Sequence, residues 1–171
     1  MDLQALLNDK ILKPKDKTEQ LSALLLDGSI DSMELMNFAK TAKDAIKATC
    51  IESLEFATQT KPGIITSADL DLIIQSLADK APRTRWESAK VIANTIHLFP
   101  EKINEAVKTL LDNTEHPGTV VRWSAATALS AILKLKTPIN KTLQAAAEAI
   151  MEREEKNSIK KIYFAALKKI K

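Results

Sequence analysis

Apolar residues recur along most of the chain at intervals of three and four positions. Ile103, Ala106, Val107, Leu110 and Leu111 show this spacing clearly. Because a helix turns once every 3.6 residues, such spacing places the apolar side chains on one helix face. No segment shows a convincing period of two, which a half-buried strand would have. We therefore predict helices over residues 2–12, 18–27, 31–42, 44–60, 67–79, 83–98, 101–114, 119–135, 139–155 and 158–170.

All six prolines fall between these apolar-periodic segments. Proline lacks a backbone N–H and ends or begins a helix, so its placement supports the predicted boundaries. Asp31 with Glu34 three residues later, and Ser67 before an acidic first turn, are typical helix starts. The short links between the ten predicted helices indicate antiparallel helical pairs.

A dipeptide ending in a cation recurs four times, as Ile46-Lys47, Thr84-Arg85, Val121-Arg122 and Ile159-Lys160, at separations of 38, 37 and 38 residues. The residues three, four and seven positions after each cation match in type, because most of them are apolar. A fixed period of this size is the signature of stacked repeats. We predict one all-α domain over residues 1–171, with an irregular N-terminal helix pair (1–27) and four repeats over 28–60, 66–99, 101–136 and 139–170.

Each recurring cation lies within the apolar stripe of its helix, where an unpaired charge would cost several kcal/mol. A carboxylate precedes three of the four cations by six or seven residues. This predicts a structural ladder in which Arg85 pairs with Asp79 or a carboxylate of a neighbouring repeat, and Arg122 pairs with Glu115 or Asp79. Glu154 stands in the same relation to Lys160. In the first copy Asp44 is only three residues before Lys47, so we expect no rung there.

The strongest repeat match is Pro117 followed by Val121-Arg122-Trp123-Ser124-Ala125-Ala126-Thr127-Ala128-Leu129, and the segment 82–89 is the next best. This pattern of a proline, Val-Arg and Ala-Ala-x-Ala-Leu resembles the second helix of the HEAT repeat family. The resemblance covers residues 66–171 well, covers 31–60 less well and is absent over 1–27. It implies a right-handed α-α superhelix, a structural ladder between acidic residues and arginine, and a concave side lined by the second helices.

Composition and charge narrow the function classes. The N-terminus has no basic segment followed by an apolar one, and no run of about 18 apolar residues occurs, so we expect a soluble, cytoplasmic protein. The single cysteine, Cys50, lies in an apolar helical pattern, which predicts a buried thiol. Residues 1–80 carry 9 basic and 13 acidic residues, whereas residues 81–171 carry 16 basic and 9 acidic ones. We therefore expect opposite charge at the two ends.

The residues that usually carry enzymatic chemistry are not arranged for it. His97 and His116 lack metal-ligand spacing, and the sequence has neither a phosphate-binding glycine loop nor a nucleophile motif. The chain is distantly similar to HEAT-like alkylpurine DNA glycosylases, which place tryptophans near a catalytic carboxylate, but Lys90 and Thr127 stand one turn after its tryptophans. We predict no enzyme activity, no metal and no cofactor, with glycosylase activity as a remote alternative.

Two tryptophans, Trp86 and Trp123, occupy matched positions at the edge of the apolar face of two second helices. They either form a ridge in a binding groove or seal the contact between neighbouring helices. The predicted partner-binding residues are Trp86, Lys90, Asn94, His97, Trp123, Thr127, Lys134, Lys161 and Lys168. We predict a scaffold that binds another protein. The alternative is nucleic-acid binding, with lysines and Arg83 contacting phosphates and tryptophans stacking on bases.

Overall fold

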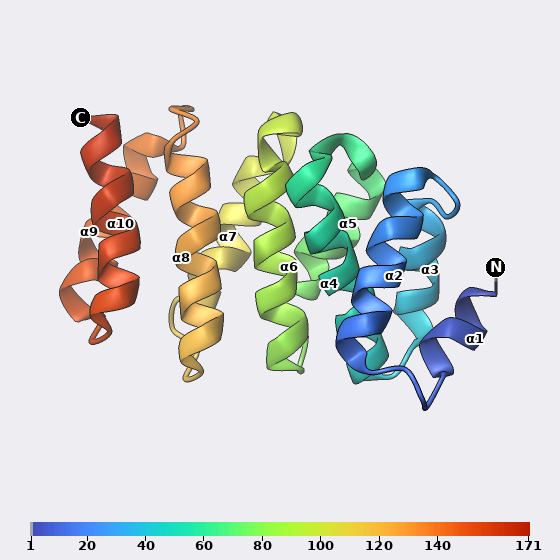
Figure 1. Cartoon of the computed structure of the whole chain (residues 1–171). Helices are drawn as coiled ribbons and strands as arrows, with labels where there is room; N and C mark the ends of the chain where they lie inside the picture. Colours follow the sequence, from blue (N-terminus) through green and yellow to red (C-terminus); the bar gives the residue numbers. More distant parts are fainter. Residues whose placement is uncertain (1) are drawn as a thin grey trace.

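The chain folds into a stack of α-helices, as shown by a computed structural model that describes residues 2–171 (Figure 1). No strand occurs within these residues, so the all-α prediction is confirmed. Short 3₁₀ turns lie at Pro62–Ile64, Ile96–Leu98 and Pro100–Lys102. The α-helices are α1 (Leu3–Asn8), α2 (Pro14–Asp27), α3 (Ser32–Thr41), α4 (Asp44–Thr60), α5 (Ser67–Ser76), α6 (Pro82–Thr95), α7 (Ile103–Asn113), α8 (Thr119–Leu133), α9 (Asn140–Arg153) and α10 (Asn157–Ile170).

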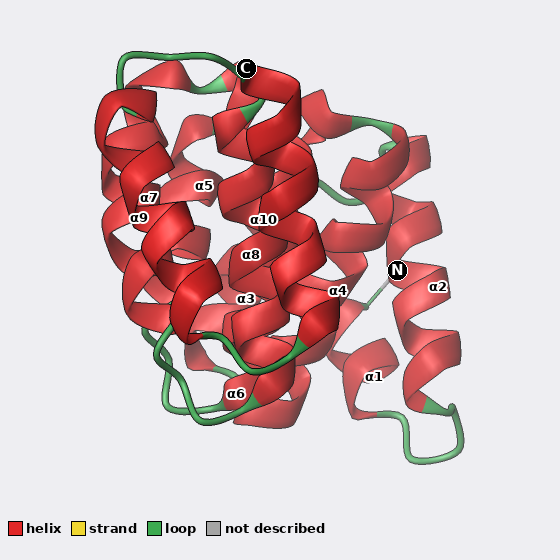
Figure 2. Cartoon of the chain, turned by 90° about the vertical axis from the view of Figure 1, so that its left-hand side faces the viewer, coloured by secondary structure: helices red, strands yellow, loops and turns green. Residues whose placement is uncertain are grey.

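The helices form two layers. Helices α2, α4, α6, α8 and α10 lie side by side in chain order and form what we call the second-helix layer, while α3, α5, α7 and α9 lie behind them (Figure 1). Seen along the stack, α7 and α9 lie on one side of α8 and α10 (Figure 2). Each second helix packs closely on the next, whereas contacts between successive helices of the rear layer are sparse. This is the arrangement of a repeat solenoid.

The first two helices differ from the sequence-based boundaries. Helix α1 ends at Asn8 rather than at residue 12, because the Asp9 carboxylate accepts the N–H groups of Ile11 and Leu12 and turns the chain. Helix α2 begins at Pro14 rather than at residue 18. Proline has no N–H to leave unpaired in the first helical turn, so it is a favourable first residue. Pro82 begins α6 in the same way.

Other helix starts follow the expected capping chemistry. The Asp31 carboxylate accepts the Glu34 N–H at 2.6 Å and caps α3, as predicted from the sequence. Helix α5 is capped by Thr66 rather than by Ser67, through a reciprocal pair of contacts with Asp69. Such a capping box satisfies two backbone donors that a helix start leaves unpaired. These caps fix where α3 and α5 begin.

The repeated apolar positions form one continuous core. Leu54, Ile92, Leu129 and Leu167, which are equivalent by repeat, are all buried. Cys50 is also buried, as predicted, and burial raises the pKa of its thiol to about 12. The last repeat differs at one of these positions. Tyr163 and Leu167, three and seven residues after Lys160, are buried, but Phe164, four residues after it, is 60% exposed.

Candidate functional site

The recurring cations lie in the first turn of the second helices, and the first three reach forward to the next hairpin. Lys47 on α4 pairs with Asp79 at 2.5 Å, and Arg122 on α8 pairs with Glu154 at 2.9 Å. In both cases the partner lies 32 residues further along the chain. Between these two rungs, the Arg85 guanidinium donates to the Asn113 amide oxygen at 2.8 Å. The ladder therefore joins successive repeats.

These pairings differ from those expected from sequence spacing. Arg85 contacts Asp79 only through its backbone oxygen, and Glu115 pairs with Arg153 rather than with Arg122. The first copy does form a rung, contrary to expectation, through Lys47. The physical reason is stacking, because each helix start lies beside the interhelical turn of the following hairpin. No carboxylate within residues 2–171 lies within ion-pairing distance of Lys160.

The ladder carboxylates are stabilised in their charged form. Burial alone would raise the pKa of Asp79, but the Lys47 ammonium and the Ala81 N–H lower the pKa below its usual value. Burial likewise opposes ionisation of Glu154, and hydrogen bonds from Arg122 and the Lys156 N–H outweigh it and lower the pKa. The ladder thus ties the repeats together at neutral pH, where both carboxylates are charged.

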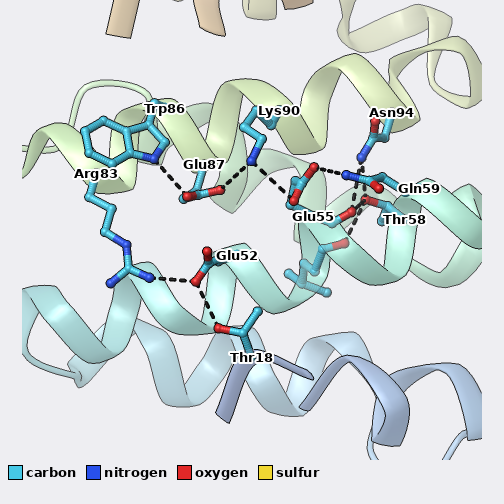
Figure 3. Close-up of polar contacts among 11 residues, drawn as sticks. Thr18, Glu52, Glu55, Thr58, Gln59, Arg83, Trp86, Glu87, Lys90 and Asn94 are labelled. Carbon is cyan, nitrogen blue, oxygen red and sulfur yellow. Dashed lines mark hydrogen bonds and ion pairs between the residues drawn. The ribbon is translucent and has the colours of Figure 1, made fainter. Parts of the chain in front are cut away.

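A second group of polar residues, which we call the α4–α6 network, lies on the second-helix layer between α4 and α6 (Figure 3). Its members are Thr18, Glu52, Glu55, Thr58, Arg83, Trp86, Glu87, Lys90 and Asn94. At one end, Glu52 accepts hydrogen bonds from Thr18 of α2 at 2.9 Å and from Arg83 of α6 at 2.6 Å. One carboxylate therefore joins three neighbouring second helices. Arg83, considered above for phosphate contact, has its guanidinium paired within the protein.

The centre of the network holds two buried carboxylates and one ammonium group. Glu87 accepts the Trp86 indole N–H at 2.8 Å and a bond from Lys90 at 3.3 Å. Lys90 also lies 3.4 Å from the Glu55 carboxylate across the helix contact (Figure 3). Glu55 and Glu87 are only 2% and 4% exposed. Because one ammonium serves two carboxylates, the centre carries a net negative charge when all three groups are ionised.

Burial and neighbouring charges shift the pKa values of Glu87 and Lys90. Burial raises the pKa of the Glu87 carboxyl, and the Lys90 charge and the Trp86 N–H only partly offset this effect. Burial alone would lower the pKa of Lys90, but the Glu87 and Glu55 carboxylates more than compensate and raise the pKa. Lys90 is thus held in its charged form by the two acids that need it.

Asn94 completes the network one turn further along α6. Its amide donates to the Glu55 backbone oxygen at 3.2 Å and to the Thr58 hydroxyl oxygen at 3.1 Å. Both acceptors lie on α4, and the Thr58 hydroxyl in turn donates to the Leu54 backbone oxygen. Asn94 therefore fastens α6 to α4.

Helix α8 presents a different surface at the equivalent positions. Trp123 is 39% exposed, and its indole N–H has no hydrogen-bond partner within residues 2–171. The Ser124 and Thr127 hydroxyls donate to backbone oxygens of their own helix, those of Val121 and Trp123. Lys134 is exposed at the C-terminal end of the helix. Trp123 is thus the tryptophan with spare surface and a spare donor.

The nine residues predicted for partner binding therefore separate into two groups. Trp86, Lys90 and Asn94 belong to the α4–α6 network and are tied to neighbouring side chains. Trp123 and Thr127 lie on α8, and the remaining four are exposed: His97, Lys134, Lys161 and Lys168. Only the first group is joined into one site by direct contacts.

Sequence reasoning missed the buried acids at the centre of the network. Neither Glu55 nor Glu87 was among the residues predicted for partner binding or for the ladder. Two signals were present in the sequence: Glu87 is three residues before Lys90, and Glu52 is three residues before Glu55. Residues at this spacing share a helix face. Glu52 and Glu55 could therefore have been recognised as one charged group on α4, and Glu87 and Lys90 as another on α6.

Residues 2–171 offer neither a cluster of metal ligands nor a helix that could span a membrane. No group of three or more histidine, cysteine, aspartate or glutamate side chains is placed to hold a metal ion. No helix in this part of the chain is long and apolar enough to cross a bilayer.

No protein-family model and no curated protein matches the sequence. Solved structures do match. A designed armadillo repeat protein in complex with the peptide (KR)4 has a TM-score of 0.74 at 15% identity, with 99% of this chain and 80% of that chain covered. A computationally designed armadillo repeat protein for modular peptide recognition gives 0.75 at 15% identity, with 99% and 81% covered.

A natural protein is similar over nearly the whole of both chains. The complex of CpcE and CpcF of phycocyanin lyase from Nostoc sp. PCC7120 contains a chain with a TM-score of 0.72 and 16% identity, and 96% of each chain is covered. At these identities the likeness concerns the fold. It agrees with the two-layered stack of helices described above. The chain has the fold of the armadillo and HEAT-like repeat solenoids.

Proposed function

We propose that the chain is a non-catalytic scaffold that binds another polypeptide on its second-helix layer, with Trp123 as the central contact. The observation that carries this proposal is the exposure of Trp123, which is 39% exposed and has no internal acceptor for its indole N–H within residues 2–171. Tryptophan is enriched at protein interfaces and among the residues that dominate binding energy. A partner would supply both the apolar contact and the missing acceptor.

The packing of the layers supports placing the partner on this side. The second helices pack closely on one another, whereas the rear helices are more widely separated along the stack. In a curved stack the more closely packed layer lies on the inside, so this surface is suited to form a groove. Extended concave surfaces are the usual binding surfaces of solenoid proteins.

Charge indicates how a partner would lie. The ionic groups of the α4–α6 network contact one another and its central carboxylates are buried, so the network offers a partner little accessible charge. Toward the C-terminal end, Lys134, Lys161 and Lys168 are exposed. We therefore infer that the partner segment carries acidic residues where it passes α8 and α10. Complementary charge would speed association and fix the orientation of the segment.

The similar structures support a protein partner. One designed armadillo protein was solved with a bound peptide, another was designed for peptide recognition, and the phycocyanin lyase chain was solved in a complex of two proteins. Since one neighbour belongs to a lyase, the absence of catalysis remains part of the proposal rather than a consequence of the fold. Fold likeness alone does not transfer activity.

The proposal is tested by selecting peptides from a random displayed library on the intact protein and measuring their affinity for variants. We expect the selected peptides to be acidic, and we expect Trp123→Ala to weaken their binding by about tenfold or more. Lys161→Glu and Lys134→Glu should also weaken it, whereas Lys108→Glu on the rear helix α7 is the matched control. Peptides that bind Trp123→Ala and the wild type equally would contradict the proposal.

Nucleic-acid binding remains the second candidate because the exposed cations gather in the C-terminal half, where residues 81–171 carry 16 basic and 9 acidic residues. Binding through phosphates depends steeply on salt, since each neutralised phosphate releases counterions. A short DNA or RNA duplex should then be retained at low salt and released at higher salt. Failure of either duplex to bind at low salt would exclude this candidate.

A further inference from the structure

The stack ends at α10 with a helix face that is buried in the preceding repeats. Ile51, Ala89, Ala126 and Phe164 are equivalent by repeat, because each lies four residues after its recurring cation. The first three are completely buried, whereas Phe164 is 60% exposed. A large aromatic residue therefore stands uncovered at a position that is otherwise covered by protein.

Neighbouring residues show which way this face points. Glu55, one turn after Ile51 on α4, contacts Lys90 on the following second helix, α6. Ser130, one turn after Ala126 on α8, donates to the Ile162 backbone oxygen on α10. Residues four apart share a helix face, so this position faces the next second helix of the stack. On α10 the corresponding face carries Phe164 and the exposed Lys168.

The same end of the stack has an apolar hollow. Phe164 and Leu167 of α10 line it together with Met151 of α9, and Glu148, Lys168 and Lys171 stand at its rim. Its volume is about 380 Å³. A hollow of this size accommodates several apolar side chains of a packed helix.

The ladder supplies an independent observation at this end of the structure. Each of the first three recurring cations receives an oxygen acceptor from the hairpin that follows it: Asp79, Asn113 or Glu154. Lys160 is the fourth cation, and it has no carboxylate within pairing distance in residues 2–171. If Lys160 followed the pattern of the other three cations, its acceptor would come from the interhelical turn of one more hairpin.

We propose that the α9–α10 end docks a helical hairpin of a partner protein, which stacks on α10 as a further repeat would. Its second helix would cover Phe164 with apolar side chains, and its turn would place a carboxylate beside Lys160. Acidic residues along its flanks would face Lys161, Lys168 and Lys171, so the partner hairpin is acidic. This surface shares Lys161 and Lys168 with the peptide-binding surface proposed above, but it is defined by Phe164 and Lys160 and does not depend on the function proposed for Trp123.

A second copy of the chain fits this end less well. Two α10 helices meeting face to face would bring Lys161 and Lys168 of one copy against the same lysines of the other, and like charges at close range repel. At the opposite end of the stack, Leu3 and Leu7 of α1 are buried. Like charge therefore opposes face-to-face pairing of two copies, and sedimentation velocity detects a head-to-tail arrangement as self-association.

The test uses the intact chain and two synthetic helical hairpins of about 35 residues. One has leucines on one face of each helix with glutamates in its turn and along its flanks, and the other has lysines in place of every glutamate. Fluorescence anisotropy should show that the acidic hairpin binds about tenfold or more tightly than the basic one. Phe164→Ser and Lys160→Glu should each weaken binding of the acidic hairpin by a similar factor.

Phe56→Ser is the matched control, because Phe56 is also an exposed aromatic residue of a second helix, at 40% exposure, but lies on α4. It should leave hairpin affinity within about twofold, and thermal melts will show that the variants are folded. Equal binding of the two hairpins, or unchanged binding by Phe164→Ser, would overturn the proposal. So would Phe164-dependent binding to phosphatidylserine vesicles without hairpin binding, or Phe164-dependent self-association in sedimentation velocity.

Discussion

Helices α6 and α8 carry tryptophans at equivalent repeat positions, yet the two side chains have different surroundings. The Trp86 indole donates to Glu87, which contacts Lys90, which in turn contacts Glu55 on the neighbouring helix. Trp123 is followed by Ser124, whose hydroxyl turns back to its own helix. One tryptophan is therefore held in a network that joins two helices, and the other is left available.

The difference comes from side-chain length and charge at the positions that follow each tryptophan. Glutamate and lysine are long enough to cross between helices, and a buried charge has to find a partner there. Serine and threonine are short and satisfy themselves on the backbone one turn earlier. The same repeat position can thus serve stability in one helix and binding in the next.

Removing the ammonium group at the centre of the network should have the largest effect. Lys90→Ala leaves Glu55 and Glu87 buried without their shared counter-charge, which should lower the free energy of unfolding by about 3 kcal/mol. The equivalent change on α8, Thr127→Ala, should cost less than about 0.5 kcal/mol because Thr127 bonds only its own helix. Urea unfolding followed by circular dichroism measures both.

The contrast between α6 and α8 would be wrong if Lys90→Ala lowered the free energy of unfolding no more than Thr127→Ala does. In that case the two buried carboxylates are not stabilised by Lys90, and the network is not what holds α6 to α4. Equal costs in the two variants would also remove the distinction drawn between the two helices.

The tryptophans themselves should separate stability from binding. Trp86→Ala removes a partly buried side chain and the donor to Glu87, so we expect a loss of about 2 kcal/mol of unfolding free energy. Trp123→Ala should cost about half of this or less, because the side chain is 39% exposed. Binding of selected peptides should show the reverse order for folded protein. A Trp123→Ala variant that unfolds while Trp86→Ala stays stable would reverse the assignment.

The outer end of the network should matter less than its centre. Arg83 pairs with Glu52 at 2.6 Å, and the two side chains remain 33% and 24% exposed. Partly exposed ion pairs contribute about 1 kcal/mol or less, so Arg83→Ala should cost about that amount. Val120→Ala, at the equivalent and exposed position of α8, is the control and should be nearly neutral. High salt should reduce the cost of Arg83→Ala and leave that of Val120→Ala unchanged.

Much of the fold could be predicted from the sequence because it depends on periodicity. The apolar spacing and the recurring cations at Lys47, Arg85, Arg122 and Lys160 indicated stacked helical pairs, and the structure and its similarity to known solenoids confirm an all-α repeat fold. The burial of a residue such as Leu129 follows from its position in the repeat alone, so it could be predicted without knowing which residues contact it.

The contacts between repeats could not be read in this way. Asp79 and Glu154 were recognised as ladder acids, but each was assigned to the cation that follows it rather than to the one 32 residues before it. Local spacing favours partners close in sequence, whereas stacking brings together residues one repeat apart. Glu55 and Glu87 were missed for the same reason, since their burial depends on a neighbouring helix.

The smallest expected effect is the most specific. A fall in pH should change the contributions of the ladder and of the α4–α6 network to the free energy of unfolding in opposite directions. The pKa of Asp79 is lowered below 3.8, so Asp79 stabilises the fold at neutral pH and this contribution is lost as the pH falls. The pKa of Glu87 is raised above 4.5, so its contribution is gained as the pH falls and is lost as the pH rises through the folded value. Urea unfolding gives, for each variant, the free energy of unfolding at pH 7 minus that at pH 4. Asp79→Asn should make this difference smaller than in the wild type, and Glu87→Gln should make it larger. If both variants change it in the same direction, the buried carboxyl of Glu87 is stabilised by its neighbours as fully as Asp79 is, and the contrast between the two regions is wrong.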